Sequence, residues 1–118
     1  MSNRRPLRPT YVGAIHQASI SGPGGLRLIG DADTGCGWFE GVDGPGRIWP
    51  IWPEGFTGSF NPIRVYDAEG NLFAEEGQRY SSLGGSEAAD RRDECRQTQD
   101  AVASWRVGEM GGSMPLAP

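Results

Sequence analysis

The sequence contains no lysine and a single histidine, so arginine supplies all eleven of its positive charges. Fifteen acidic residues outnumber them, and the formal net charge is -4 at pH 7. Surfaces that bind nucleic acid depend on many cationic contacts with phosphate, and grooves for single strands are basic along their length. The charge balance therefore argues against a nucleic-acid partner.

Long apolar segments are missing as well. No apolar run approaches the roughly 20 residues that a membrane-spanning helix needs. Residues 1–9 are basic, but residues 11–20 contain His16, Gln17 and Ser19 and are too polar for the apolar core of a signal peptide. We therefore expect a disordered N-terminal tail over residues 1–9, no membrane insertion and a cytoplasmic location. A mature exported form, with its signal removed, is the alternative.

Cysteine is scarce, because the chain has only Cys36 and Cys95. Two cysteines cannot form a structural zinc site by themselves. Adding the lone His16 would give only three ligands, two from cysteine and one from histidine. If the cysteines meet in space, a disulfide between them stabilises the fold by about 4 kcal/mol on chain-entropy grounds. In a reducing cytosol the same residues would stay thiols. We predict no metal and no cofactor, and both states of the cysteines remain open.

Glycine and proline, by contrast, are abundant, with nineteen and nine residues. Such a density favours frequent turns over long helices. The clearest element spans residues 61–74, where apolar residues alternate on both sides of a turn over residues 67–71. Gly70 can adopt positive φ at no steric cost, so the segment predicts a β-hairpin with a type I turn and a glycine bulge. The predicted fold class is therefore all-β.

Short extended segments of the same kind recur along the chain. One of them, residues 47–52, contains Pro50 and is followed by Pro53. Because proline has no N–H to donate a hydrogen bond to a neighbouring strand, we expect this strand to lie at a sheet edge or to end early. The predicted strands are residues 11–20, 26–29, 36–42, 47–52, 56–60, 63–66, 72–75, 78–83 and 105–107.

The spacing of these strands predicts a single domain over residues 10–108. We expect a small, partly open barrel of the OB or SH3-like kind, with about seven to nine short strands. Residues 86–94 are polar and rich in helix formers, which predicts a short helix or loop excursion before the last strand. Residues 109–118 are expected to form a loose tail.

Several short motifs recur at intervals along the chain: Gly35-Cys36, Ile48–Pro50, Ile51–Phe56, Ile63–Gly70, Glu76-Gly77 and Leu83–Gly85. Together they resemble a diffuse group of small bacterial β proteins of unassigned activity, found in actinobacteria and firmicutes. The group combines a Gly-Cys strand, a Trp-Pro turn, an Asp-x-x-Gly hairpin and a later Gly-Gly, and some members are lipoproteins. This chain lacks a lipobox and has Gln78 where the group usually has an acidic residue. The resemblance implies a compact β fold and carries over no catalytic residue.

Asp33-Thr34-Gly35 matches the core of the aspartic-protease signature. Such an enzyme needs two aspartates that share a proton, so a chain with one motif would have to act as a dimer. Asp31 lies where the family has apolar residues, and the expected second apolar-apolar-Gly element downstream is missing. An aspartate-rich turn between two strands accounts for the same residues.

The four tryptophans are candidates for either core or contact surface. Trp49 and Trp52, each followed by a proline, would form a rigid apolar platform with Phe56 if they are exposed. The alternative is that these aromatic side chains fill the interior. For Trp38 and Trp105 we expect the core.

These observations favour a non-enzymatic β-barrel module that binds a protein partner through Trp49, Trp52 and Phe56. Two alternatives belong to other functional classes. One is a dimeric aspartic-type hydrolase that uses Asp33, and the other is a structural subunit of a larger assembly, such as a phage or cell-envelope particle. The oligomeric state is left open.

Overall fold

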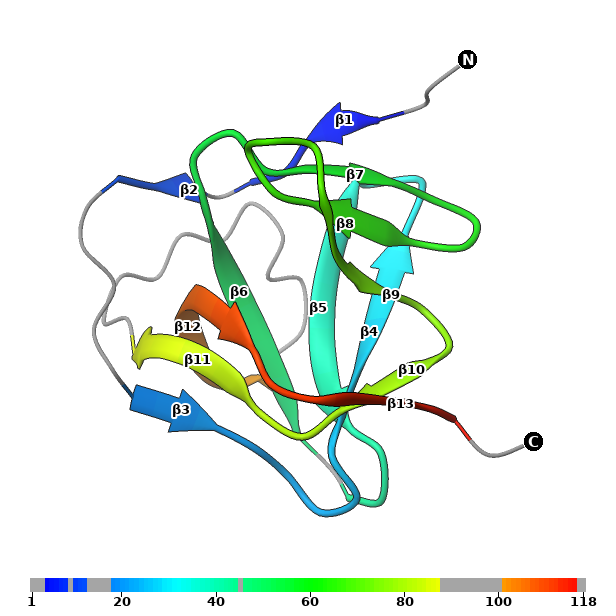
Figure 1. Ribbon diagram of the computed structural model, residues 1–118, viewed down its shortest axis with the longest axis vertical. Coiled ribbons are helices and arrows are strands. Elements are labelled where there is room, and N and C mark those ends of the chain that lie inside the picture. Colours follow the sequence, from blue (N-terminus) through cyan, green and yellow to red (C-terminus); the bar gives the residue numbers. More distant parts are fainter. Residues whose placement is uncertain (1–3, 9, 13–17, 45, 88–100, 117–118) are drawn as a thin grey trace.

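The computed structural model describes residues 4–8, 10–12, 18–44, 46–87 and 101–116 (Figure 1). Over these residues the chain forms short strands and no helix, which confirms the all-β prediction. The strands are β1 (Arg5–Pro6), β2 (Thr10–Tyr11), β3 (Ala18–Ile20), β4 (Leu26–Asp31), β5 (Cys36–Gly41), β6 (Arg47–Pro53), β7 (Thr57–Ser59), β8 (Arg64–Tyr66), β9 (Leu72–Glu75), β10 (Gln78–Tyr80), β11 (Leu83–Glu87), β12 (Ala101–Met110) and β13 (Ser113–Pro115).

The strands form two sheets. A four-stranded sheet has the order β1-β7-β8-β9, and a nine-stranded sheet has the order β13-β10-β4-β5-β6-β12-β11-β3, with β2 added to β6. All pairs are antiparallel except those of β6 with β12 and with β2. The ladder does not close into a barrel over the described residues, and the thirteen strands there exceed the predicted number.

One reason for the larger number is a kink in a predicted strand. Residues 78–83 were expected to form one strand, but Ser81 and Ser82 separate β10 from β11. The Ser81 N–H donates to the Gly112 carbonyl at 2.8 Å, and the Gly111 N–H donates to the Ser82 carbonyl at 2.9 Å. The bend therefore lies beside the connection from β12 to β13.

The predicted hairpin is confirmed as β8, β9 and the turn between them. The Gly70 N–H donates to the Asp67 carbonyl at 2.9 Å, and Gly70 has a φ of 88°. Asp67 Oδ1 accepts hydrogen bonds from the N–H groups of Glu69 and Asn71, both at 2.9 Å. The Asp67 N–H donates to the Asn71 carbonyl at 2.8 Å, so Gly70 and Asn71 both lie opposite Asp67 and form the predicted glycine bulge. A separate register shift between Val65 and Tyr66 leaves Phe73 as an extra residue on β9. Local turn chemistry alone specifies this element, which is why the sequence predicts it well.

The edge position predicted for residues 47–52 is wrong, because β6 lies between β5 and β12. The β5 ladder reaches β6 only at Arg47 and Ile48. Pro50 therefore has a ladder partner on the β12 side alone, and Pro53 pairs only with β2. A central strand accommodates these prolines because each lies where a neighbouring ladder has stopped.

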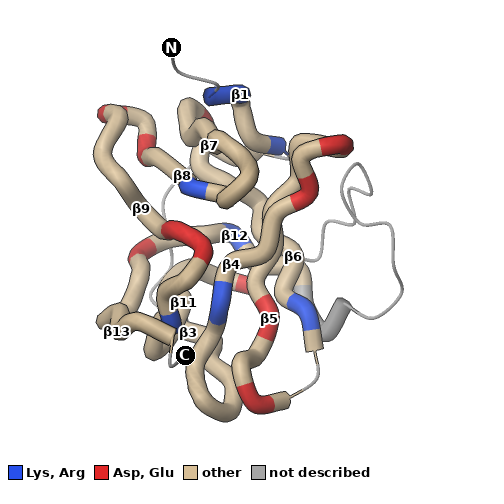
Figure 2. Tube along the Cα trace, turned by 90° about the vertical axis from the view of Figure 1, so that its right-hand side faces the viewer, with Lys and Arg blue, Asp and Glu red and all other residues tan. Residues whose placement is uncertain are grey.

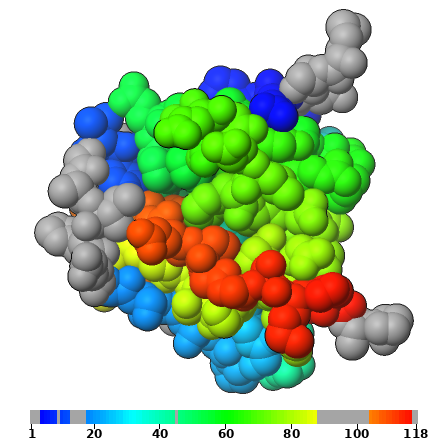
Figure 3. Space-filling model, viewed as in Figure 1, coloured from blue at the N-terminus to red at the C-terminus, as the bar shows by residue number. Residues whose placement is uncertain are grey.

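Both predicted tails contain strands. Within residues 1–9, β1 pairs with β7, and Leu7 is only 2% exposed. Within residues 109–118, β12 continues to Met110 and β13 pairs with β10. In the space-filling view this C-terminal segment, coloured orange to red, lies on the visible face of the molecule (Figure 3). Pairing with strands distant in sequence orders both segments, and neither has an apolar alternation of its own.

Other predicted boundaries also shift. Residues 86 and 87 of the expected excursion belong to β11, and residues 88–94 lie outside the described part. The predicted first strand, residues 11–20, is represented by β2 and β3 at its two ends. His16 lies between them, outside the described residues.

The two sheets meet at Ile63. Gly30 of β4 and Gly37 of β5 are directly opposite each other in the ladder. A Cβ added at Gly30 would lie 2.6 Å from Ile63 Cβ, and one at Gly37 would lie 2.7 Å from Ile63 Cδ1. The glycine pair therefore forms a slot for Ile63, which is 1% exposed. Beside it Trp52 packs against three phenylalanines: Phe39, Phe56 and Phe73.

The slot can be tested by filling it. Gly37→Ala is expected to lower the free energy of unfolding by about 1–3 kcal/mol, the usual range for overpacking. Ile63→Val removes the Cδ1 atom that the new methyl group would meet. The double mutant Gly37→Ala/Ile63→Val should therefore recover part of the free energy of unfolding that Gly37→Ala loses. At Gly30 the added Cβ would meet three atoms of Ile63, so the same second change should recover less. Urea unfolding of the wild type, the three single mutants and the two double mutants measures these changes. Equal recovery at both glycine positions would contradict the slot.

Tyr80 makes stability sensitive to alkali. Its phenol oxygen accepts a hydrogen bond from the Glu75 N–H at 2.8 Å, and the residue is 5% exposed. Burial raises the pKa of Tyr80 above its ordinary value of 10.0 and outweighs the hydrogen bond from the Glu75 N–H, which lowers it. The folded state thus favours the neutral phenol. The stability that this preference contributes is fully present below pH 10 and is lost as the pH rises through the pKa of Tyr80 in the folded state. The free energy of unfolding from urea titrations should fall above about pH 10, and less steeply in Tyr80→Phe. An unchanged slope in that variant would contradict the assignment.

Candidate functional site

The predicted aromatic platform is buried. Trp52 is 0% exposed, Trp49 6% and Phe56 8%. Trp52 and Phe56 belong to the main core, whereas Trp49 packs on Cys36 and on half-buried Trp38, with 5.1 Å between the two indole centroids. This expectation is therefore corrected: the three side chains fill the interior, the alternative that burial of a large aromatic area favours in a small domain.

The Trp38 and Trp105 expectations have different outcomes. Trp105 is 5% exposed, and its indole N–H donates to the Gly84 carbonyl at 3.0 Å. This confirms a core role. Trp38 lies at the margin of the small cluster with Trp49, where its indole N–H reaches Glu40 at 3.4 Å.

Asp33 lies in the tight turn between β4 and β5. Its N–H donates to Asp31 Oδ1 at 2.9 Å, and the Gly35 N–H donates to the Asp31 carbonyl at 2.8 Å. Gly35 has a φ of 74°, and the Asp33 side chain is exposed. This geometry is that of an aspartate-rich turn. A dimeric hydrolase would need the same carboxylate from a second chain, and that function stays a prediction.

Cys36 is 2% exposed and disulfide-bonded. Cys95, the other cysteine of the chain, lies outside the described residues, so the pairing of the two stays a prediction. Among the described residues no group of three side chains is arranged to hold a metal ion.

The pairing predicts a specific pattern of stability. Cys36→Ala and Cys95→Ala should each lower the free energy of unfolding by about 4 kcal/mol, the loop-closure contribution. The double mutant should lose little more than either single mutant, because both remove the same bond. Urea unfolding under non-reducing conditions measures these values. Additive losses would show that the cysteines are not bonded to each other.

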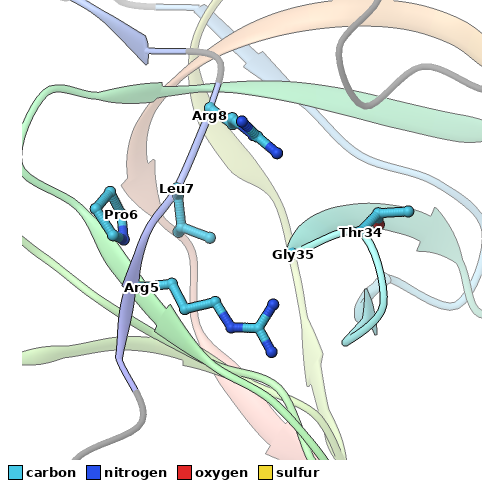
Figure 4. Close-up of a pocket in the computed structure, with 6 residues that line it drawn as sticks. All are labelled: Arg5, Pro6, Leu7, Arg8, Thr34 and Gly35. Carbon is cyan, nitrogen blue, oxygen red and sulfur yellow. The ribbon is translucent and has the colours of Figure 1, made fainter.

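A cavity of about 300 Å³ opens between β1 and the β4–β5 turn (Figure 4). This volume is at the lower end of the range for small-ligand pockets. We call it the arginine pocket, and it is lined by Arg5, Pro6, Leu7, Arg8, Thr34 and Gly35. Arg5, Leu7 and Arg8 point from β1 towards the turn, whereas Pro6 points away from it (Figure 4).

Two guanidinium groups give the pocket its electrostatic character. Arg5 Nη1 donates to the Ala32 carbonyl at 2.8 Å, and its guanidinium lies 5.1 Å from the centroid of Phe60. Arg8 is exposed on the other side of Leu7. Arginine remains charged at all accessible pH values and can bind a carboxylate or phosphate with two parallel hydrogen bonds. The β1 segment is thus a local concentration of positive charge on an acidic chain (Figure 2).

The sequence did carry a signal for this pocket. Arg4, Arg5 and Arg8 bring three of the eleven arginines into five residues. A short basic stretch ahead of the first predicted strand is typical of a disordered tail, which is what the sequence predicts for residues 1–9. The contribution of Thr34 and Gly35 depends on tertiary structure, since these residues lie far from β1 in the sequence.

No protein-family model, curated protein or solved structure matches this chain. The resemblance to small actinobacterial and firmicute β proteins therefore stays a hypothesis. Among the described residues no helix could cross a membrane. The case for a function rests on the geometry of the arginine pocket.

Proposed function

We propose that this chain is a non-enzymatic β module, with strands arranged as a partly open barrel, that binds a protein partner by holding one of its carboxylates in the arginine pocket. The observation that carries the proposal is the convergence of Arg5 and Arg8 on one cavity of about 300 Å³. Concave sites with a few converging polar groups are the usual places for ligands. The contact surface is thus assigned to β1 and the β4–β5 turn.

A carboxylate suits this pocket better than a polyanion does. Hydrogen bonds between a guanidinium and a carboxylate are charge-assisted and roughly twice as strong as neutral ones. One carboxylate needs only the two arginines of the lining. Nucleic acid needs cationic contacts along an extended surface, and the net charge of -4 opposes that. An acidic side chain or a chain terminus of a protein provides a single carboxylate.

The cysteine chemistry bears on where such a module works. Structural disulfides persist in oxidising compartments and are rare in the cytosol. The disulfide-bonded state of Cys36 supports the exported form over the cytoplasmic one. We place the binding function outside the cytosol on this ground.

The proposal is tested with a defined probe, an N-acetylated, C-amidated peptide in which one glutamate is flanked on each side by two glycines. Titration followed by nuclear magnetic resonance should shift the amides of Thr34 and Gly35 most strongly. Arg8→Gln should weaken binding by about tenfold, the loss of one charge-assisted hydrogen bond. Added salt should weaken binding by the wild-type protein, because the site is open to solvent.

Arg79→Gln is the matched control. Arg79 lies on β10 and contacts Met114 Sδ at 3.6 Å, and it takes no part in the arginine pocket. Its replacement removes the same charge from the chain and should leave the affinity unchanged. If Arg8→Gln and Arg79→Gln reduce binding equally, the probe responds to overall charge and the proposed site is wrong.

A further inference from the structure

The arginine pocket is assembled from two parts of the chain that meet only in the folded state. Four of its six lining residues, Arg5 to Arg8, belong to β1 and the residues that follow it. Thr34 and Gly35 supply the opposite wall. If β1 separated from the sheet, Arg5 and Arg8 would move away from the β4–β5 turn and the cavity would be lost.

Few main-chain bonds to other described residues attach β1. Its ladder with β7 has two residue pairs, Arg5 with Gly58 and Pro6 with Thr57. One further bond runs from the Leu7 N–H to the Phe56 carbonyl at 3.1 Å. Segments with few buried contacts and few ladder bonds open locally, at a lower free energy than the whole domain.

Side chains also attach this segment to the rest of the domain. Leu7 packs against Gly58, where an added Cβ would lie 2.9 Å from Leu7 Cδ2. The Arg4 guanidinium lies 3.5 Å from the ring centroid of Tyr66. Arg5, which also lines the pocket, contacts Phe60 and the Ala32 carbonyl. Leu7 is therefore the main apolar anchor of the strand.

No described strand pairs with the outer edge of β1. β1 is the terminal strand of its sheet. The Leu7 N–H points towards β7, and because backbone groups alternate along a strand, those of Pro6 point to the outer edge. Proline has no N–H there, which hinders the addition of another strand. A ligand that bridges β1 and the β4–β5 turn would be the additional attachment.

We propose that docking of β1 and occupation of the arginine pocket are thermodynamically coupled, so that a carboxylate-bearing partner holds β1 in the sheet. This inference rests on the proposed function. A ligand that binds only the docked form shifts the ratio of docked to undocked strand by the factor 1 + [L]/Kd. At a ligand concentration a hundred times Kd, the shift is about a hundredfold.

Hydrogen exchange of the wild-type protein tests the coupling directly. Without ligand, the Leu7 amide should exchange faster than the amides of buried strands such as Phe39. With the single-glutamate probe at a hundred times its Kd, exchange of the Leu7 amide should slow by about a hundredfold. The Gly111 amide donates to the Ser82 carbonyl between β12 and β13, outside the arginine pocket, and it is expected to keep its rate. An unchanged Leu7 rate with bound probe would overturn the inference.

A pair of variants tests it by affinity. Leu7→Ala weakens the anchor of β1 but keeps both arginines, and should raise the Kd of the probe by tenfold or more. Leu83→Ala truncates another buried leucine, 0% exposed and outside the pocket, and should leave Kd unchanged. An equal effect of both variants, or none in Leu7→Ala, would count against coupling. If Leu7→Ala does not fold, the exchange measurement on the wild-type protein decides.

The two proposals fail in different ways. Absence of any probe binding by the wild-type protein would overturn the proposed function and the coupling with it. Binding that maps to Thr34 and Gly35 and depends on Arg8, combined with unchanged exchange at Leu7, would retain the function and overturn the coupling alone.

Discussion

The contact that the rest of the structure depends on is Ile63 in the slot between Gly30 and Gly37. It joins the four-stranded sheet to the nine-stranded sheet at a point where side chains on β4 and β5 would have kept them apart. Close packing of this kind leaves no room for an added methyl group. The positions of Trp52 and its phenylalanine neighbours follow, since they fill the remaining space between the two sheets.

A similar device orders the strand that carries the candidate site. Gly58 leaves space for Leu7, and that single buried leucine seats β1 against β7. The guanidinium groups of Arg5 and Arg8 are thereby brought opposite the β4–β5 turn, and their charge becomes part of a cavity. The turn has its shape because Asp31 accepts two backbone N–H groups. Packing thus converts a basic stretch of sequence into a pocket of defined shape.

The parts of the fold that were predicted correctly are those whose cause is local. The hairpin around Gly70 depends on residues adjacent in sequence, and strand β9 has the bounds expected for it. The candidate site was not predicted, because the proposed contact residues, Trp49, Trp52 and Phe56, carry the same apolar area whether they face water or the core. Their burial depends on which strands cover them. β1 and β13 were missed for the related reason that their pairing partners lie far away in the chain.

The sequence by itself determined the class of this protein. Frequent glycine and proline, short alternating apolar segments and an acidic balance exclude a helical fold and disfavour a nucleic-acid surface, because turn chemistry and net charge are properties of composition and of near neighbours. Tertiary structure alone decided that β6 is central, that the tryptophans are mostly interior and that the arginines near the N-terminus face a cavity. Each of these depends on contacts between residues distant in sequence, whose energies come from burial and shape complementarity that no local pattern records.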